Sequence, residues 1–190
     1  MKKLLALFLL LCGTVGSTVP AAAQHPPEFP EPAFVGLVHA IRADGKTIPL
    51  LQESVSIRQR ASTGYRLFRI GRKEIHEITL NGAHSPIRFD KEEGIALMVC
   101  VSDNRIDPMS AVSVFRFKTK RKSRVAEYAS VDTSGGSQFH TLDRIHFTAY
   151  RFGLSSYLLI LAEVDPGEYG LTITGMQPDN LTVTTFGVDK

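Results

Sequence analysis

The densest chemical signal in this sequence is a short basic run, RFKTKRKSR, at Arg116–Arg124. None of its nine residues is acidic and six are basic, namely Arg116, Lys118, Lys120, Arg121, Lys122 and Arg124. Cations at this density attract phosphates, sulfates and carboxylates, and salt weakens that attraction. The run therefore predicts a binding site for an anion such as lipopolysaccharide, a phospholipid headgroup or an acidic glycan. The alternative interpretation is a soluble turn whose lysines prevent strand edges from pairing with other chains.

Five histidines follow the N-terminal region, at positions 39, 76, 84, 140 and 146. Zinc sites need three or four converging ligands, commonly at short spacings such as H-x₃₋₅-H. His140 and His146 stand six positions apart with Asp143 between them, which does not match such a motif. The sequence therefore assigns no metal and no cofactor. A pocket holding these three residues together would instead favour an enzyme.

Nucleophilic catalysis has no recognisable motif in this chain. The G-x-S-x-G turn of hydrolases is absent from the sequence. Cys100 lies in the apolar run Ile95–Val101, where a buried thiol behaves as a small inert hydrophobic group. We therefore assign no catalytic residue. The alternative that stays open is a hydrolase of an envelope polymer, with a site built from separated His and Asp/Glu residues.

The elements that carry these residues read as β-strands. Apolar residues recur with a period near two from Phe34 onward, and no stretch of eleven residues shows a helical stripe. Asp44-Gly45 predicts a hairpin turn between strands at Phe34–Ile41 and Thr47–Leu51. A second turn is predicted at Ala61–Gly64. These patterns predict an all-β fold.

Two strands are apolar on both faces, Ile95–Val101 and Tyr157–Val164, and we expect them in the middle of the fold. The basic run forms the turn of a predicted hairpin between strands at Ala111–Lys118 and Val125–Val131. A further alternating strand is predicted at Ile145–Arg151.

A turn after the second apolar strand identifies the layer arrangement. Pro166 fixes φ, Gly167 permits a left-handed step, and Tyr169 opens the next strand. Immunoglobulin-like domains use such a tyrosine to bond back to upstream backbone at a corner. Pro166, Gly167 and Tyr169 therefore predict an immunoglobulin-like β-sandwich, with the strand from Tyr169 paired to Leu181–Phe186.

The N-terminal region has the pattern of an export signal. Lys2 and Lys3 precede the apolar run Leu4–Leu11, and Ala21–Ala23 supplies a cleavage site, so residues 1–23 are predicted to be a signal peptide. Cys12 offers the alternative of a lipid anchor, which the leucine before it disfavours.

The remaining chain divides into a Pro-rich spacer over residues 24–33 and a single β-sandwich domain over residues 34–190. Loss of Lys2 and Lys3 leaves 20 basic against 19 acidic residues, so any positive field must be local. No later segment is long and apolar enough to span a bilayer. We expect export to the periplasm or outside the cell, which argues against nucleic acid as a partner.

Several short motifs together resemble an uncharacterised family of exported bacterial proteins that share a PGEY turn and a closing FGVD or FGID. The residues that carry this resemblance are Asn81–Ser85, Asp107-Pro108, Phe115–Lys118, Arg124, Ser156-Tyr157, Pro166–Gly170 and Phe186–Asp189. The resemblance implies a β-sandwich and export, and it implies no activity or catalytic residue.

The combined expectation is an exported cell-envelope protein without enzymatic activity, acting as a binding, accessory or structural module. Its expected partner is an anionic envelope component or another envelope protein. The oligomeric state stays open.

Overall fold

The computed structural model describes residues 29–66, 69–132, 137–140, 142–174 and 182–190. The predicted signal peptide, Cys12 and the first part of the Pro-rich spacer lie outside these residues. The described chain is almost entirely β-strand in two sheets, with a single turn of helix, α2 (Pro108–Ala111). The prediction of an all-β fold is confirmed.

No helix among the described residues has the length and apolar character needed to cross a membrane.

One sheet has five antiparallel strands in the order β11-β12-β7-β1-β2. Their bounds are Val38–Ile41 (β1), Thr47–Pro49 (β2), Ile95–Cys100 (β7), Thr148–Phe152 (β11) and Ser156–Leu161 (β12). The turn at Asp44-Gly45 joins β1 to β2 as predicted, with Gly45 at a φ of 82° that favours glycine. The two strands predicted to be central, β7 and β12, both lie inside this sheet, and all six residues of β7 are buried.

The second sheet has nine strands. Seven follow the order β3-β14-β13-β8-β9-β5-β4, while β10 pairs with β9 and β6 runs parallel to β14. Their bounds are Leu51–Ser54 (β3), Ser56–Arg66 (β4), Arg69–Asn81 (β5), Arg88–Asp90 (β6), Val112–Lys120 (β8), Ser123–Asp132 (β9), Ser137–His140 (β10), Gly167–Ile173 (β13) and Thr182–Asp189 (β14). The predicted pairing of β13 with β14 is confirmed by the register Tyr169↔Phe186.

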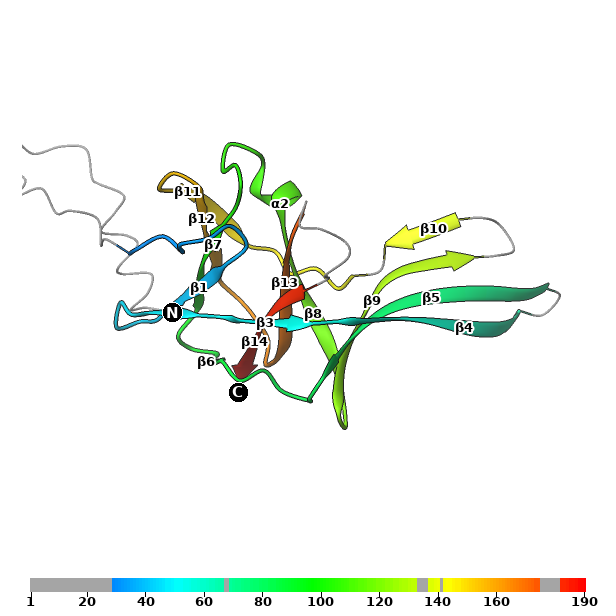
Figure 1. Ribbon diagram of the computed structural model, residues 1–190. Coiled ribbons are helices and arrows are strands. Elements are labelled where there is room, and N and C mark those ends of the chain that lie inside the picture. Colours follow the sequence, from blue (N-terminus) through cyan, green and yellow to red (C-terminus); the bar gives the residue numbers. More distant parts are fainter. Residues whose placement is uncertain (1–28, 67–68, 133–136, 141, 175–181) are drawn as a thin grey trace, which may run out of the picture.

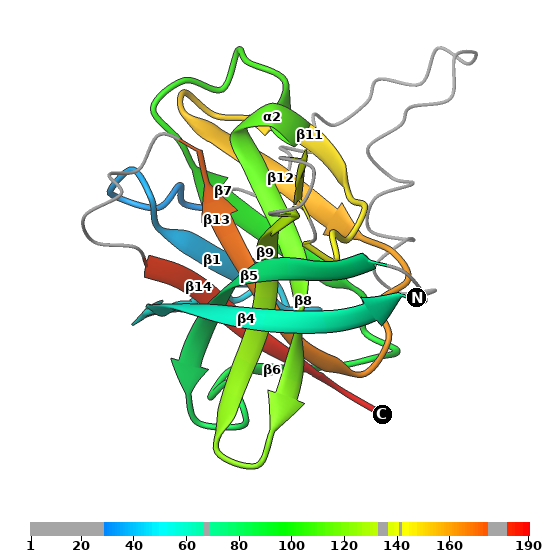
Figure 2. The same ribbon diagram turned by 90° about the vertical axis from the view of Figure 1, so that its right-hand side faces the viewer.

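This nine-stranded sheet is strongly curled. Only Val55 separates β3 from β4, yet these strands lie at opposite ends of the order, so one extended segment pairs with β14 and then with β5 (Figure 2). Residues from well-separated strands, including Ile78, Phe117 and Val183, meet in one buried cluster. We call the face that carries this cluster the enclosed face.

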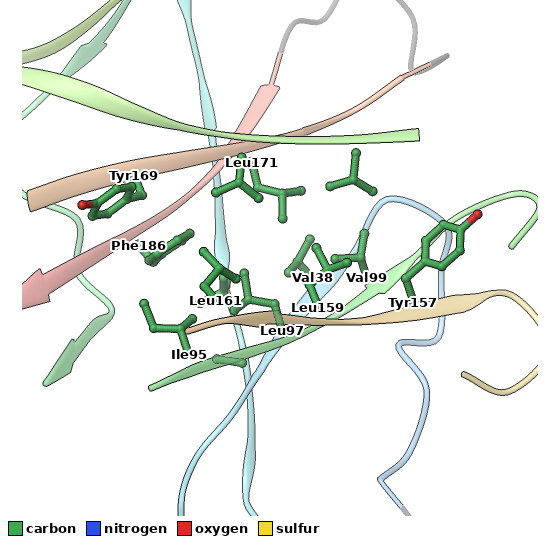
Figure 3. Packing of buried hydrophobic residues seen from close by; sticks show 14 of the residues in the cluster. Val38, Ile95, Leu97, Val99, Tyr157, Leu159, Leu161, Tyr169, Leu171 and Phe186 are labelled. Atoms are coloured by element: carbon green, nitrogen blue, oxygen red, sulfur yellow. The ribbon is translucent and has the colours of Figure 1, made fainter. Parts of the chain in front are cut away.

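The main core lies between the two sheets. Val38, Leu97 and Leu159 from the five-stranded sheet pack with Leu171 and Phe186 from the other sheet (Figure 3). β4, β5, β9 and β10 extend beyond this core, away from the five-stranded sheet (Figure 1). The turn from β12 to β13 passes from one sheet to the other. It therefore links two layers.

Four predictions of strands and turns need correction. The strand predicted at Thr47–Leu51 ends at Pro49, and Leu51 begins β3 in the other sheet. Ala61–Gly64 is not a turn, because each of its residues pairs with β5 in an unbroken ladder; small polar residues give no apolar alternation, but a neighbouring strand holds them extended. The first strand begins at Val38, since Leu37 N–H donates to the Phe34 carbonyl in a turn. Ile145 is not in β11, because its N–H bonds to the Val114 carbonyl of β8.

Candidate functional site

The basic run forms a hairpin as predicted, with β8 and β9 paired at Lys118↔Val125 and Lys120↔Ser123 around a turn at Arg121-Lys122. Its end projects at the lower edge of the molecule in Figure 1. Lys118, Lys120, Arg121 and Lys122 are all exposed. Of these four, Lys118 alone has an ion pair with a described residue, through its Nζ 3.5 Å from Glu127 Oε1.

Arg116 connects this hairpin to the predicted corner. Its Nη2 donates to the Pro166 carbonyl at 2.7 Å, and its guanidinium lies 6.0 Å from the ring centroid of Tyr169. The φ angle of Gly167 is not positive, so the left-handed step predicted at this residue is wrong. Space beside Gly167 is limited, because an added Cβ would lie 3.0 Å from Arg116 Nε and the Arg116 side chain would have to shift slightly.

Tyr169 lies at the crossing between the sheets. Its hydroxyl donates to the carbonyl of Asp165, four residues upstream. Its ring stacks on Phe186 with 5.4 Å between centroids. Burial raises the pKa of the Tyr169 hydroxyl above its usual value, with a smaller opposing effect from Arg116.

Arg124 departs from the other members of the run because its side chain is buried. It shares a face of β9 with Ala126, and alternation turns both toward the enclosed face. Its Nη2 lies 2.7 and 2.9 Å from the two carboxylate oxygens of Glu53, and its Nη1 donates to Ser85 Oγ at 2.7 Å. Arg124 is therefore a structural residue and is removed from the predicted anion-binding surface.

A second buried charge, Glu168, lies at the same end of the enclosed face, since its neighbour Gly170 faces Phe115, Phe117 and Val183. The carboxylate of Glu168 accepts bonds at three points. The donors are Arg88 Nη1 at 2.6 Å, the Ser85 N–H at 2.7 Å and His84 Nδ1 at 3.1 Å.

The net pKa of Glu168 reflects these bonds. Burial raises the pKa of this carboxyl, but the hydrogen bonds from Arg88, Ser85 and His84 together outweigh burial and hold it below its usual value. Arg88 also bonds Asp189, at 2.8 Å. Ser85 accepts from Arg124 while its N–H donates to Glu168, so the buried charges form one connected network.

The structure does not bring His140, His146 and Asp143 together in one site. The side chain of His140 lies outside what the structure describes, and His146 is exposed and does not line the pocket that Asp143 lines. The described contact between a histidine and a buried carboxylate is instead His84–Glu168. No group of three or more His, Cys, Asp or Glu side chains among the described residues is placed to hold a metal ion.

A surface pocket of about 650 Å³ lies beside the hairpin. Charged side chains of both signs line it, Arg116 and Lys118 with Glu127 and Asp143, together with Pro166 and Gly167 of the corner. It forms where β8 and β9 separate. At that point the Arg116 N–H donates to the Asp143 carbonyl, so the segment before β11 lies alongside β8. Two features predicted separately, the basic run and the corner, therefore meet in one pocket.

Sequence reasoning missed the carboxylates of this region, Glu53, Glu127 and Glu168. Glu168 lies within the PGEY motif, to which the sequence assigns no charge contact. The sole local signal was its place beside a buried tyrosine, and its partners Arg88 and Ser85 are 80 and 83 positions away.

Comparison of the chain with protein-family models and with curated proteins finds no match.

Proposed function

We propose that this protein is an exported, non-enzymatic binding module of the cell envelope, and that the basic hairpin binds an anionic envelope component. The proposal rests on the exposure and the missing ion pairs of Lys120, Arg121 and Lys122. They are exposed at the end of a projecting hairpin and have no ion pair with a described residue. Nearby Arg88 and Arg124 are instead bonded to internal carboxylates.

We also propose that the protein is exported, that it belongs to the exported bacterial family it resembles and that its sheets have an immunoglobulin-like arrangement. Two sheets around one core and the Tyr169 hydroxyl bond at the crossing support the arrangement. The long β4–β5 hairpin is an addition to it.

The test measures binding of the exported protein to vesicles of phosphatidylglycerol, to vesicles of phosphatidylcholine and to lipopolysaccharide over a range of salt. The wild type should bind the anionic surfaces and lose affinity as salt rises. Replacing Lys118, Lys120, Arg121 and Lys122 with serine should abolish this binding.

A charge-matched control replaces four exposed cations elsewhere, Lys46, Arg58, Lys91 and Arg105, with serine. This control should keep most of the binding if position matters more than net charge. Equal loss in the two variants, or binding that is insensitive to salt, would contradict the proposal.

The second candidate function is a hydrolase of an envelope polymer, and the His84–Glu168 contact is the observation that favours it. A buried carboxylate that accepts from Nδ1 leaves Nε2 free to take a proton. Turnover of an envelope polymer that is lost in His84→Asn, with unchanged stability, would favour the hydrolase over the binding module.

A further inference from the structure

The geometry points to a saccharide subsite in the pocket beside the hairpin, which takes one acidic sugar unit of an anionic glycan. This inference deepens the proposed function, because it names the class of anion and the place where one unit of it is recognised.

The lining of the pocket carries charges of both signs. Arg116 and Lys118 offer cationic donors, while Asp143 and Glu127 offer carboxylate acceptors. A bare anion such as phosphate would use the cations and be repelled by the carboxylates. An acidic sugar satisfies both, since its carboxylate accepts from the cations and its hydroxyls donate to Asp143 and Glu127.

Lys118 and Glu127 already form an ion pair at 3.5 Å, but the pocket retains unused bonding capacity at Arg116 and Asp143. Of the donors of Arg116, Nη2 is committed to the Pro166 carbonyl. Asp143 is exposed, and its side chain accepts no hydrogen bond from a described residue. The pocket volume of about 650 Å³ also lies within the range of small-molecule sites, so it can hold a sugar ring.

A row of cations on β8 gives the direction in which a polymer would continue from the pocket. Arg116, Lys118 and Lys120 alternate along β8, so all three lie on one face of the strand. They span roughly 13 Å at about 3.3 Å per residue. A glycan with one unit in the pocket can therefore follow this row to the exposed cations at the end of the hairpin.

The experiment measures binding of a galacturonate tetramer by calorimetry, with the neutral galactose tetramer as its matched control. The exported wild type should bind the acidic tetramer at least ten times more tightly than the neutral one. Asp143→Ala removes one hydroxyl acceptor at an exposed position and should weaken binding of the acidic tetramer about tenfold, with an unchanged unfolding midpoint.

A second variant separates the subsite from the hairpin end. Replacing Lys120, Arg121 and Lys122 with serine should abolish binding to phosphatidylglycerol vesicles and weaken the acidic tetramer through its outer units, while the preference for the acidic over the neutral tetramer is kept. In Asp143→Ala the vesicle binding should persist. The two proposals can therefore fail separately. A wild-type protein that does not bind phosphatidylglycerol vesicles would contradict binding by the hairpin. A wild-type protein that does not discriminate between the acidic and the neutral tetramer would contradict the subsite.

Three results would overturn the subsite. The first is equal affinity for the acidic and neutral tetramers, since the cations would then contribute nothing. The second is displacement of the tetramer by inorganic phosphate at equal concentration, which would mean that the pocket recognises charge alone. The third is an Asp143→Ala protein that folds normally and binds the acidic tetramer like the wild type.

Discussion

Arg124 and Arg121 lie three positions apart in the same basic run, yet they occupy opposite environments. The guanidinium of Arg124 is buried and donates to Glu53, Ser85 and two carbonyls. Arg121 lies exposed in the hairpin turn. The difference comes from what faces each residue. β9 turns Arg124 toward the enclosed face, where Glu53 and the segment Asn81–Ser85 supply acceptors. The Arg121 side chain has no hydrogen bond or ion pair with a described residue.

This contrast divides the run into a buried structural residue, Arg124, and the exposed cations around the hairpin turn, which keep their charge for a partner. A buried arginine stabilises the fold only while its carboxylate partner is present, because each charge is costly to bury alone. An exposed cation adds little to stability and keeps its charge for an external partner. Replacing the arginine should therefore destabilise the fold at Arg124 and leave its stability nearly unchanged at Arg121.

The largest effect is expected for Arg124→Ala. Removing the guanidinium leaves Ser85 and the Glu53 carboxylate without their main partner, so the free energy of unfolding should fall by about 3 kcal/mol. Urea unfolding measures this change. Arg121→Ala in the same run is the matched control and should change stability by less than about 0.5 kcal/mol. Similarly small losses of unfolding free energy in Arg124→Ala and Arg121→Ala would contradict the structural role of Arg124.

The next effect concerns Glu168 and depends on pH. Glu168→Gln should lower stability at pH 7 by about 2 kcal/mol, because a charged acceptor of three hydrogen bonds is replaced by a neutral one. The pKa of Glu168 in the folded protein lies below its usual 4.5, so its stabilisation is complete above that pH and is lost as pH falls through the folded-state pKa.

The difference between wild type and Glu168→Gln should therefore shrink below about pH 4.5. Unfolding curves collected from pH 7 to pH 3 measure it. Glu163→Gln, at an exposed position, should show no such trend. A constant difference across the range would mean that the Glu168 carboxylate is not the stabilising form.

The smallest stability effect is expected for Tyr169→Phe, at about 1 kcal/mol. The ring and its stacking on Phe186 are kept, and only the hydroxyl bond to the Asp165 carbonyl is lost. Asp165 is exposed, so water can replace part of that bond. Thermal unfolding measures the loss, and an unchanged midpoint would show that the corner does not depend on the hydroxyl.

The sequence by itself determined most of the local structure. The strands β7 and β12 follow from their continuous apolar runs. The turn at Asp44-Gly45 and the hairpin of the basic run follow from turn chemistry and period-two alternation. These signals involve neighbours in the chain, so they can be read without knowing the fold. The error at Ala61–Gly64 has the same origin, because its extended state depends on pairing with β5 and not on its own residues.

Only the tertiary structure decided which charges are buried and which residues share a pocket. Arg124 meets Glu53 across 71 positions, and Thr185 meets that same Glu53 across 132. These contacts require the order of strands in the curled sheet, which alternation does not encode. The pocket depends on the same order, since β8, β9, the Asp143 segment and the Pro166-Gly167 turn converge only after the sheets form. A carboxylate opposite a cation decides whether that cation stabilises the fold or stays free to bind, and strand order places it there.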